Sequence, residues 1–211
     1  MKHLIIIGVG GFAREVYWHA QGSLGYGIDW DIKGFLDGDV KLAPEEYEKL
    51  CLPVLGDVAT YAIAPDDVFI CAIGNPPVKR KLVEGMLARG ATFMNLIHQT
   101  VIIHGTVRMG TGIICCPNVT IHDASVVGNY VTFNGRANLG HDCRVGDFSS
   151  LMGQAGLLGG ATAGENVYMG ADALALPHSV IENDAYVGVR SVVFKRVRAG
   201  RKVFGNPAMP I

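Results

Sequence analysis

A histidine followed directly by an aspartate is the pair in this chain best suited to chemistry. His141 and Asp142 stand in the stretch NLGHDCRVGDF, residues 138–148, which is otherwise rich in glycine, valine and small residues. A neutral imidazole accepts a proton near neutral pH, and an adjacent carboxylate fixes its tautomer and supports its basicity. The pair is therefore a candidate general base. From the residues alone, the alternative is a solvated surface turn in which both side chains merely tolerate a corner.

A glycine-rich turn near the start is a candidate phosphate site. Gly8, Gly10 and Gly11 follow the apolar run LIII and precede the helix start FAREV. Glycines let the backbone approach a phosphate, and the N–H groups at a helix N-terminus point toward it. Ala13 stands where the third glycine of the GxGxxG fingerprint would be. A tight strand–helix turn without a ligand is therefore an equal alternative.

The elements around this turn alternate between strands and helices. The runs HLIII, DIKGFLD and DVFICAIGN predict buried strands, and ATFMNLI predicts a further strand that leads into the second half. The segment PPVKRKLVEGMLARG, residues 76–90, predicts a helix that ends at Gly90. We expect its apolar face to be Val78, Leu82, Val83, Met86 and Leu87. This alternation predicts a small parallel α/β domain over residues 1–96.

Polar residues follow two of these predicted strands. Asp37 ends DIKGFLD, where an acid can hydrogen-bond ribose hydroxyls or a base edge. Gly74 and Asn75 end DVFICAIGN, at the same edge of a parallel sheet. We therefore expect Gly8, Gly10, Gly11, Asp37, Gly74 and Asn75 to form the nucleotide-binding edge of this domain.

The second half of the chain repeats every six residues. From Ile103 onward, the first residue of sixteen consecutive blocks is apolar, and the fifth is small or β-branched in almost all of them. Neither a helix nor an alternating strand has this period. One block can form a short strand and a turn, and three blocks can close a triangular coil around the first-position residues. We predict an all-β parallel β-helix over residues 97–211, with His141 at an outward-pointing third position.

Composition narrows the classes of function. The 211 residues carry a net charge of −1, which gives no basic field for nucleic acid. No apolar run reaches the roughly 18 residues of a membrane span. The short apolar run in MKHLIIIGVGG predicts a buried strand in preference to a signal peptide. Five cysteines without a CxxC pair favour neither a disulfide framework nor a zinc ribbon. We expect a cytoplasmic protein.

Taken together, these motifs resemble those of the bacterial nucleotide-aminosugar N-acetyltransferases and their sialic acid O-acetyltransferase relatives. The resemblance rests on a Rossmann-like domain, then NLIH at residues 95–98, a hexapeptide-repeat β-helix with GHDC at 140–143, and a closing GNPA turn at 205–208. It covers essentially the whole chain and implies a left-handed β-helix. It also implies direct acetyl transfer from acetyl-CoA to the 4-amino group of a UDP-, GDP- or dTDP-linked deoxy-amino sugar. O-acetylation of sialic acid or another sugar is the alternative.

The resemblance also implies roles for individual residues. His141 would be the base and Asp142 its partner, and Asn134 would join the nucleotide-binding residues near the sugar. Acetyl-CoA would lie along the β-helix between neighbouring subunits of a homotrimer. The Gly159 N–H, one coil from His141, would donate to the thioester oxygen. The residues expected on the acetyl-CoA side are Gly159, Ala161 and Gly170. The stretch LMGQAGLLGG, residues 151–160, departs from the family pattern.

Two functions of other classes stay open. His104 and His122 are 18 residues apart and should stack in one column. With His141 they suggest a trimeric zinc enzyme of the γ-carbonic-anhydrase type, in which three histidines converge on the metal. That class does not need the N-terminal domain, so we expect no metal. The other alternative is a structural or regulatory sugar-nucleotide binder without catalysis.

Overall fold

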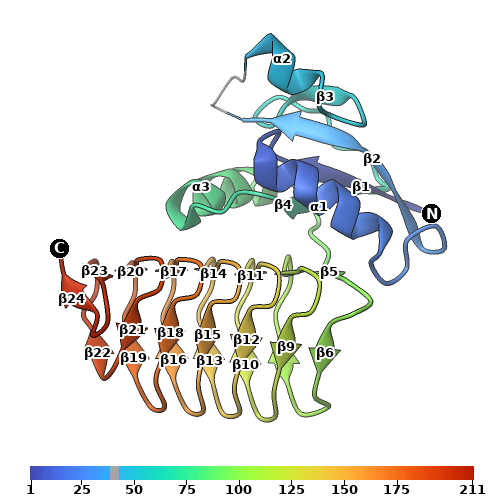
Figure 1. The fold of residues 1–211 in the computed structure, drawn as a ribbon. Coiled ribbons are helices and arrows are strands. Elements are labelled where there is room, and N and C mark those ends of the chain that lie inside the picture. The colour runs from blue at the N-terminus through green and yellow to red at the C-terminus, as the bar shows by residue number, and fades with distance from the viewer. Residues whose placement is uncertain (39–42) are drawn as a thin grey trace.

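A parallel four-stranded sheet between two helices forms the first part of the molecule (Figure 1). The computed structural model describes residues 1–38 and 43–211. The sheet order is β3-β2-β1-β4, and all of its pairings are parallel. The elements are β1 (Lys2–Ile7), α1 (Gly11–Gln21), β2 (Trp30–Asp37), α2 (Pro44–Tyr47), β3 (Val54–Asp57), β4 (Asp67–Cys71) and α3 (Pro76–Leu87).

The central strand explains the apolar run at the start of the sequence. Leu4 to Ile7 of β1 are completely buried, with alternate residues in two clusters on opposite sides of the sheet. One cluster includes α1 and the other includes α3, so both faces of the sheet are covered, as a parallel sheet requires. The predicted strands β1, β2 and β4 and the helix after Asn75 are confirmed. The short elements α2 and β3 were not predicted, because neither has a clear apolar period.

The buried face of α3 differs from the prediction. The helix buries Pro76, Lys79, Val83 and Met86, whereas Val78 is 45% exposed and Leu87 41% exposed. The structure selects the i, i+4, i+7 series that begins at Lys79. The sequence analysis missed this series because it considered only apolar residues, and the first member of the series is a lysine.

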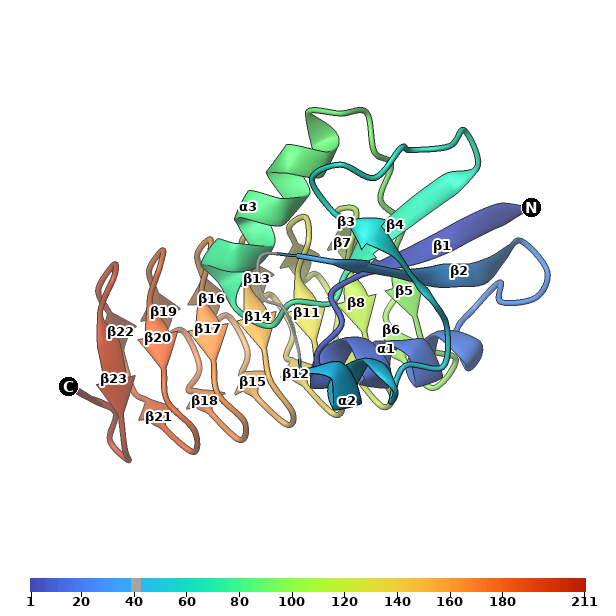
Figure 2. The ribbon, with the colours of Figure 1, turned by 90° about the horizontal axis from the view of Figure 1, so that it is seen from above.

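The second part of the molecule is a left-handed parallel β-helix with three flat faces (Figures 1 and 2). We call these the first, second and third faces in chain order. The first face contains β5 (Leu96–Ile97), β8 (Ile114–Cys115), β11 (Thr132–Phe133), β14 (Ser150–Leu151), β17 (Tyr168–Met169), β20 (Tyr186–Val187), β23 (Lys202–Phe204) and β24 (Met209–Pro210). The second contains β6 (Ile102–Ile103), β9 (Thr120–Ile121), β12 (Asn138–Leu139), β15 (Gly156–Leu157), β18 (Leu174–Ala175) and β21 (Val192–Val193). The third contains β7 (Arg108–Met109), β10 (Val126–Val127), β13 (Arg144–Val145), β16 (Thr162–Ala163), β19 (Val180–Ile181) and β22 (Arg196–Val197).

The predicted six-residue register is confirmed. Leu139 pairs with Ile121 and Leu157, each 18 residues away, so three blocks make one coil. The first-position residues from Cys115 to Val193 are all buried and fill the prism. The fifth-position residues from Ile113 to Val197 are buried as well.

Each corner of the prism uses a left-handed residue. Every sixth residue from Asn118 to Arg190 has a φ between 55° and 62°, except that Gly160 has 70°. This conformation is uncommon for non-glycine residues. The repeat therefore imposes the same corner geometry on asparagine, aspartate, arginine and aromatic residues alike. The preferences of single residues for left-handed backbone would not predict this for arginine or aromatic residues.

The N-terminal domain sits on the first face, and the two parts share buried clusters. The two parts meet closely, because Leu96, Ile114 and Cys116 pack with residues of β1 and α1. The predicted boundary between residues 96 and 97 falls inside β5, which already pairs with β8. ATFMNLI contributes only an isolated bridge at Phe93 to the N-terminal sheet before it enters β5. At the other end, β24 turns back antiparallel on β23 after the GNPA turn.

Candidate active site

The His141–Asp142 pair lies in the turn that joins β12 to β13. The imidazole Nδ1 is 2.7 Å from Asp142 Oδ2, and the His141 side chain is 69% exposed. When Nδ1 carries the hydrogen and donates it to the carboxylate, Nε2 presents its lone pair. Asp142 is one of the left-handed corner residues, with φ 59°. The corner geometry therefore places both side chains outside the prism, as predicted.

Gly159 lies directly against the imidazole of His141, one coil further along. A Cβ at residue 159 would stand 2.5 Å from Nε2, so only glycine lets the ring lie in this position. The neighbouring Gly160 N–H donates to the His141 carbonyl at 2.9 Å. The Gly159 N–H has no backbone acceptor within the described residues. Within the described residues, the Gly159 N–H is therefore a donor without a backbone partner beside the candidate base.

Ala161 shares this corner, but Gly170 does not. Ala161 is a buried fifth-position residue and cannot reach a surface ligand with its side chain. Gly170 follows β17 on the first face, and a Cβ there would clash with Val189 N at 2.6 Å. The structure therefore separates Gly170 from the Gly159 turn by one face of the prism.

The glycine turn before α1 is open at its outer side. Gly8 has φ 116°, and a Cβ there would meet Ile73 Cδ1 at 3.1 Å and Ala72 O at 3.2 Å. Gly10 is the N-cap of α1, and added Cβ atoms at Gly10 and Gly11 would meet nothing within 3.9 Å except the tip of Arg14. The turn thus exposes helix N–H groups next to the end of β4, as a phosphate site would require.

Asp37 lies at the carboxyl end of β2, as predicted, and has partners already. Its Oδ1 accepts from the Gly38 N–H at 2.7 Å, and its Oδ2 accepts from the Tyr47 hydroxyl. Each carboxylate oxygen keeps a second lone pair. The side chain is therefore held in place without losing its capacity to bind hydroxyl groups.

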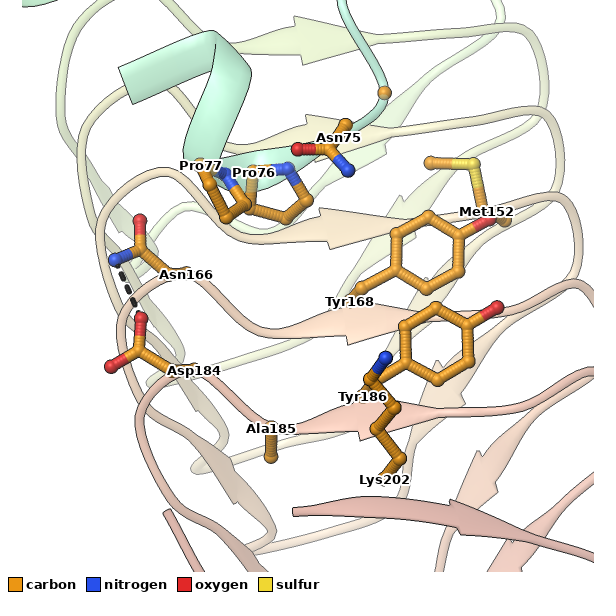
Figure 3. A pocket seen from close by; sticks show the side chains of 11 residues that line it. Asn75, Pro76, Pro77, Met152, Asn166, Tyr168, Asp184, Ala185, Tyr186 and Lys202 are labelled. Atoms are coloured by element: carbon orange, nitrogen blue, oxygen red, sulfur yellow. Dashed lines mark hydrogen bonds between the residues drawn. The ribbon is translucent and has the colours of Figure 1, made fainter. Parts of the chain in front are cut away.

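Gly74 and Asn75 open a cavity of about 630 Å³ between α3 and the first face of the β-helix (Figure 3). Asn75 is the N-cap of α3, and its Oδ1 accepts from the Val78 N–H at 3.1 Å. Met152 lies across from Gly74. Asn134 precedes Met152 by one coil, and its Oδ1 accepts from the Gly135 N–H at 2.6 Å.

One chain does not bring the two predicted halves of the site together. The N-terminal domain covers the first face, whereas the turn from β12 to β13 lies at the corner between the second and third faces, on the far side of the prism (Figure 1). The nucleotide edge and His141 are therefore separated by the body of the β-helix. Asn134 follows β11 on the first face, so within one chain it is also separated from His141.

The other predicted histidines stack but do not converge on His141. The rings of His104 and His122 are 4.9 Å apart, as their 18-residue spacing predicts. His104 is exposed and His122 half-buried, so neither ring points into the prism interior. Residues 1–38 and 43–211 contain no group of three His, Cys, Asp or Glu side chains that could hold a metal ion.

Two sets of residues at the domain junction escaped the sequence analysis. Lys79 is 1% exposed, and its ammonium or amine nitrogen is 3.1 Å from Thr132 Oγ1 and 2.9 Å from Ser150 Oγ. Burial lowers the pKa of Lys79 to about 7. Tyr168 and Tyr186 stack in parallel at 4.8 Å along the first face. The available signals were the i, i+4, i+7 spacing of Lys79 with Val83 and Met86, and the 18-residue spacing of the tyrosines.

Known proteins are similar to this chain both in its N-terminal domain and over its whole length. Residues 3–86 match the PglD N-terminal domain family. The chain is 30% identical over 146 residues to GDP-perosamine N-acetyltransferase of Escherichia coli O157:H7, which covers 66% of each protein. PerB from Caulobacter crescentus, solved with CoA and GDP-perosamine, superposes with a TM-score of 0.88 at 27% identity over all of this chain and 98% of that one. The acetyltransferase domain of PglB from Neisseria gonorrhoeae FA1090 gives 0.88 at 26% identity over the full length of both.

The chain belongs to the hexapeptide-repeat bacterial sugar N-acetyltransferases.

Membership in this family confirms the family and the acyltransferase class that the sequence motifs predicted. The aligned segment spans just under two thirds of the Escherichia coli relative, whereas the solved relatives match over nearly their whole length. The PglB domain has also been solved with acetyl coenzyme A. No helix in the described part of the chain is long and apolar enough to cross a bilayer.

Proposed function

We propose that this protein transfers an acetyl group from acetyl-CoA directly to the 4-amino group of a nucleotide-linked deoxy-amino sugar, with His141 as the general base. The observation that carries the proposal is the exposed imidazole whose Nδ1 is tied to Asp142 and whose Nε2 lies over Gly159. The family's solved members with CoA, acetyl-CoA and GDP-perosamine support the two substrate classes.

The chemistry needs three things from the protein. The amine must attack the thioester carbonyl in line, it must lose a proton, and the oxyanion that forms must be stabilised. His141 Nε2 takes the proton, and Asp142 stabilises the imidazolium that forms. The Gly159 N–H donates to the thioester oxygen. Collapse of the tetrahedral intermediate then expels the CoA thiolate, which takes up a proton as the amide forms.

The substrates come from opposite sides of the prism, so we propose a homotrimer as the active form. In a C3 arrangement the N-terminal domain of one subunit faces the His141 corner of its neighbour. Gly8, Gly10, Gly11, Asp37, Gly74 and Asn75 of one chain then hold the nucleotide, and Asn134 lies at its sugar end. Gly159 and Ala161 of the neighbouring chain line the acetyl-CoA path. In this arrangement Gly170, which follows β17 on the first face, lines the other wall of the acetyl-CoA path.

A panel assay tests this function. Purified protein is incubated with acetyl-CoA and UDP-, GDP- and dTDP-linked 4-amino sugars, and both free thiol and acetylated sugar nucleotide are quantified. We expect one amino sugar nucleotide to be acetylated on nitrogen in stoichiometric proportion to the thiol released. If only hydroxyl groups are acetylated, the protein is a sugar O-acetyltransferase and the proposed N-acetylation is wrong. Binding of sugar nucleotides without thiol release would identify a non-catalytic binder, and loss of activity on chelation would point to a metal enzyme.

A further inference from the structure

The uncovered end of the first face carries an aromatic platform. The N-terminal domain covers Ile114, Thr132 and Ser150, the outward residues of the earlier coils, which are buried. In the next two coils the same column holds Tyr168 and Tyr186, whose rings are parallel within 7° and 4.8 Å apart. Tyr186 is 38% exposed. Because the two rings stack on each other, the pair keeps an outer ring face on which a planar ring can continue the stack.

This platform forms one wall of the 630 Å³ cavity that begins at Gly74 and Asn75 (Figure 3). Pro76 and Pro77 of α3 lie on the other side, and Met152 closes one end. The cavity therefore continues from the predicted nucleotide edge of the N-terminal domain onto the β-helix. Its volume falls within the usual range for sites that bind small ligands.

Polar groups in the lining beside the two tyrosines suit a charged, nitrogen-rich ligand. Asn166 lines the cavity, and its Oδ1 is buried without a hydrogen-bond partner in the described part of the chain. Its Nδ2 donates to Asp184 Oδ1 at 2.9 Å, which fixes the amide. A buried acceptor without a partner is costly unless a ligand donor satisfies it. Lys202 places a cation on the lining beyond Tyr186.

We propose that this cavity binds the base of a nucleotide, stacked on the outer face of the Tyr168–Tyr186 pair, with an N–H of the base donating to Asn166 and Lys202 binding a phosphate or carbonyl oxygen. The inference rests on the proposed function, which brings two nucleotides to the enzyme. One is the nucleoside diphosphate of the sugar donor, and the other is the adenosine 3′,5′-bisphosphate end of acetyl-CoA. The chemistry of the cavity is common to both.

Calorimetric titration of the full chain, without turnover, tests the site. The probes are GDP, UDP, dTDP and adenosine 3′,5′-bisphosphate. We expect Tyr168→Ala and Tyr186→Ala each to weaken at least one probe roughly 10-fold or more, the usual effect of losing a base–aromatic stack. Tyr186→Phe should keep the affinity, because it keeps the ring. Lys202→Ala should weaken the same probe and flatten the dependence of its affinity on salt.

The controls separate this inference from the function. Tyr26→Ala and Lys195→Ala remove an exposed tyrosine and a lysine outside the cavity and should leave all affinities unchanged, and thermal unfolding should confirm that each variant is folded. Loss confined to the nucleoside diphosphates identifies the sugar donor as the ligand, and loss confined to adenosine 3′,5′-bisphosphate identifies acetyl-CoA. Unchanged affinity for all probes in folded Tyr168→Ala and Tyr186→Ala would overturn the inference. Acetyl transfer by the wild type, measured on the same preparation, then shows whether the proposed function survives.

Discussion

At the scale of single residues, the proposed chemistry rests on one imidazole. His141→Ala should lower kcat by roughly 10²–10⁴, the usual contribution of a positioned general base. Affinity for CoA should stay nearly unchanged, because the imidazole is directed to the amine. Asp142→Asn should cause a smaller loss, since it keeps a hydrogen-bond acceptor beside Nδ1 but removes the charge that stabilises the imidazolium. Steady-state kinetics with calorimetric CoA binding would check this. Retention of more than about half of wild-type kcat in His141→Ala would remove the base assignment.

A second residue-scale prediction concerns the buried lysine between the two domains. Burial lowers the pKa of Lys79 from 10.5 to about 7. Between these values the unfolded chain binds one proton more than the folded chain, so the free energy of unfolding rises with pH. The rise attributable to Lys79 between pH 7 and pH 9 should be about 2 kcal/mol. Lys79→Met keeps a similar length and removes the titrating group.

Urea unfolding of wild type and Lys79→Met at pH 7 and pH 9, at one protein concentration, measures this difference. Groups common to both proteins, such as Tyr168 with its raised pKa, cancel in the comparison. The wild type should gain stability relative to the variant as pH rises. An equal pH dependence in the two proteins would mean that Lys79 is not held in a low-pKa state by its burial.

At the scale of elements, the corner between the second and third faces positions the base through a glycine. Gly159→Ala would place a methyl group 2.5 Å from His141 Nε2, so the ring must move. A shift of about 1 Å in a catalytic group can cost roughly 10²-fold in rate, and we expect a kcat loss of that order. Gly105→Ala is the matched control: it has the same block position at the same corner, three coils away, and its Cβ would meet nothing within 4 Å. Equal kinetics for both variants would contradict this role of Gly159.

The carboxyl edge of the N-terminal sheet gives the next prediction. Asp37→Ala should raise the KM for the sugar nucleotide with little change in kcat, because the contact is remote from the reacting amine and equal in ground and transition states. Asp37→Asn keeps an acceptor for the Gly38 N–H and so controls for loss of that turn. Initial rates over a range of sugar nucleotide concentrations would measure the split. A large fall in kcat at unchanged KM would argue against a binding role.

At the scale of the whole molecule, the separation of His141 from the N-terminal domain predicts a shared site. Light scattering should give about 67 kDa, three times the 22.5 kDa of one chain. Trimers co-assembled from His141→Ala and Asp37→Ala chains should regain activity at substrate concentrations below the KM of Asp37→Ala. With random assembly, about one site in four, one half times one half, combines an intact domain with an intact histidine. A monomer, or mixed trimers no more active than their parents, would exclude a site shared between subunits.

The β-helix and most of the N-terminal sheet could be predicted from the order of the residues alone. Sixteen blocks in one register leave no other way to bury Leu139, Leu151 and their equivalents, since a period of six fits no helix or flat strand. Chemistry at His141 could also be proposed from the sequence, because the repeat requires no polar pair there. Both inferences depend on local spacing, which a linear chain displays directly.

How the N-terminal domain and the β-helix meet could not be predicted in this way and is seen only in the folded chain. The burial of Lys79 and the position of Tyr168 and Tyr186 in one cavity with Gly74 and Asn75 depend on which face of the prism the N-terminal domain covers. The six-residue period is the same on all three faces, so the sequence pattern cannot distinguish them. The choice follows from the packing of α1 and α3 against Cys116, Tyr130 and Phe148, residues far from either helix in the chain. That packing leaves His141 on the opposite side of the prism from the nucleotide edge.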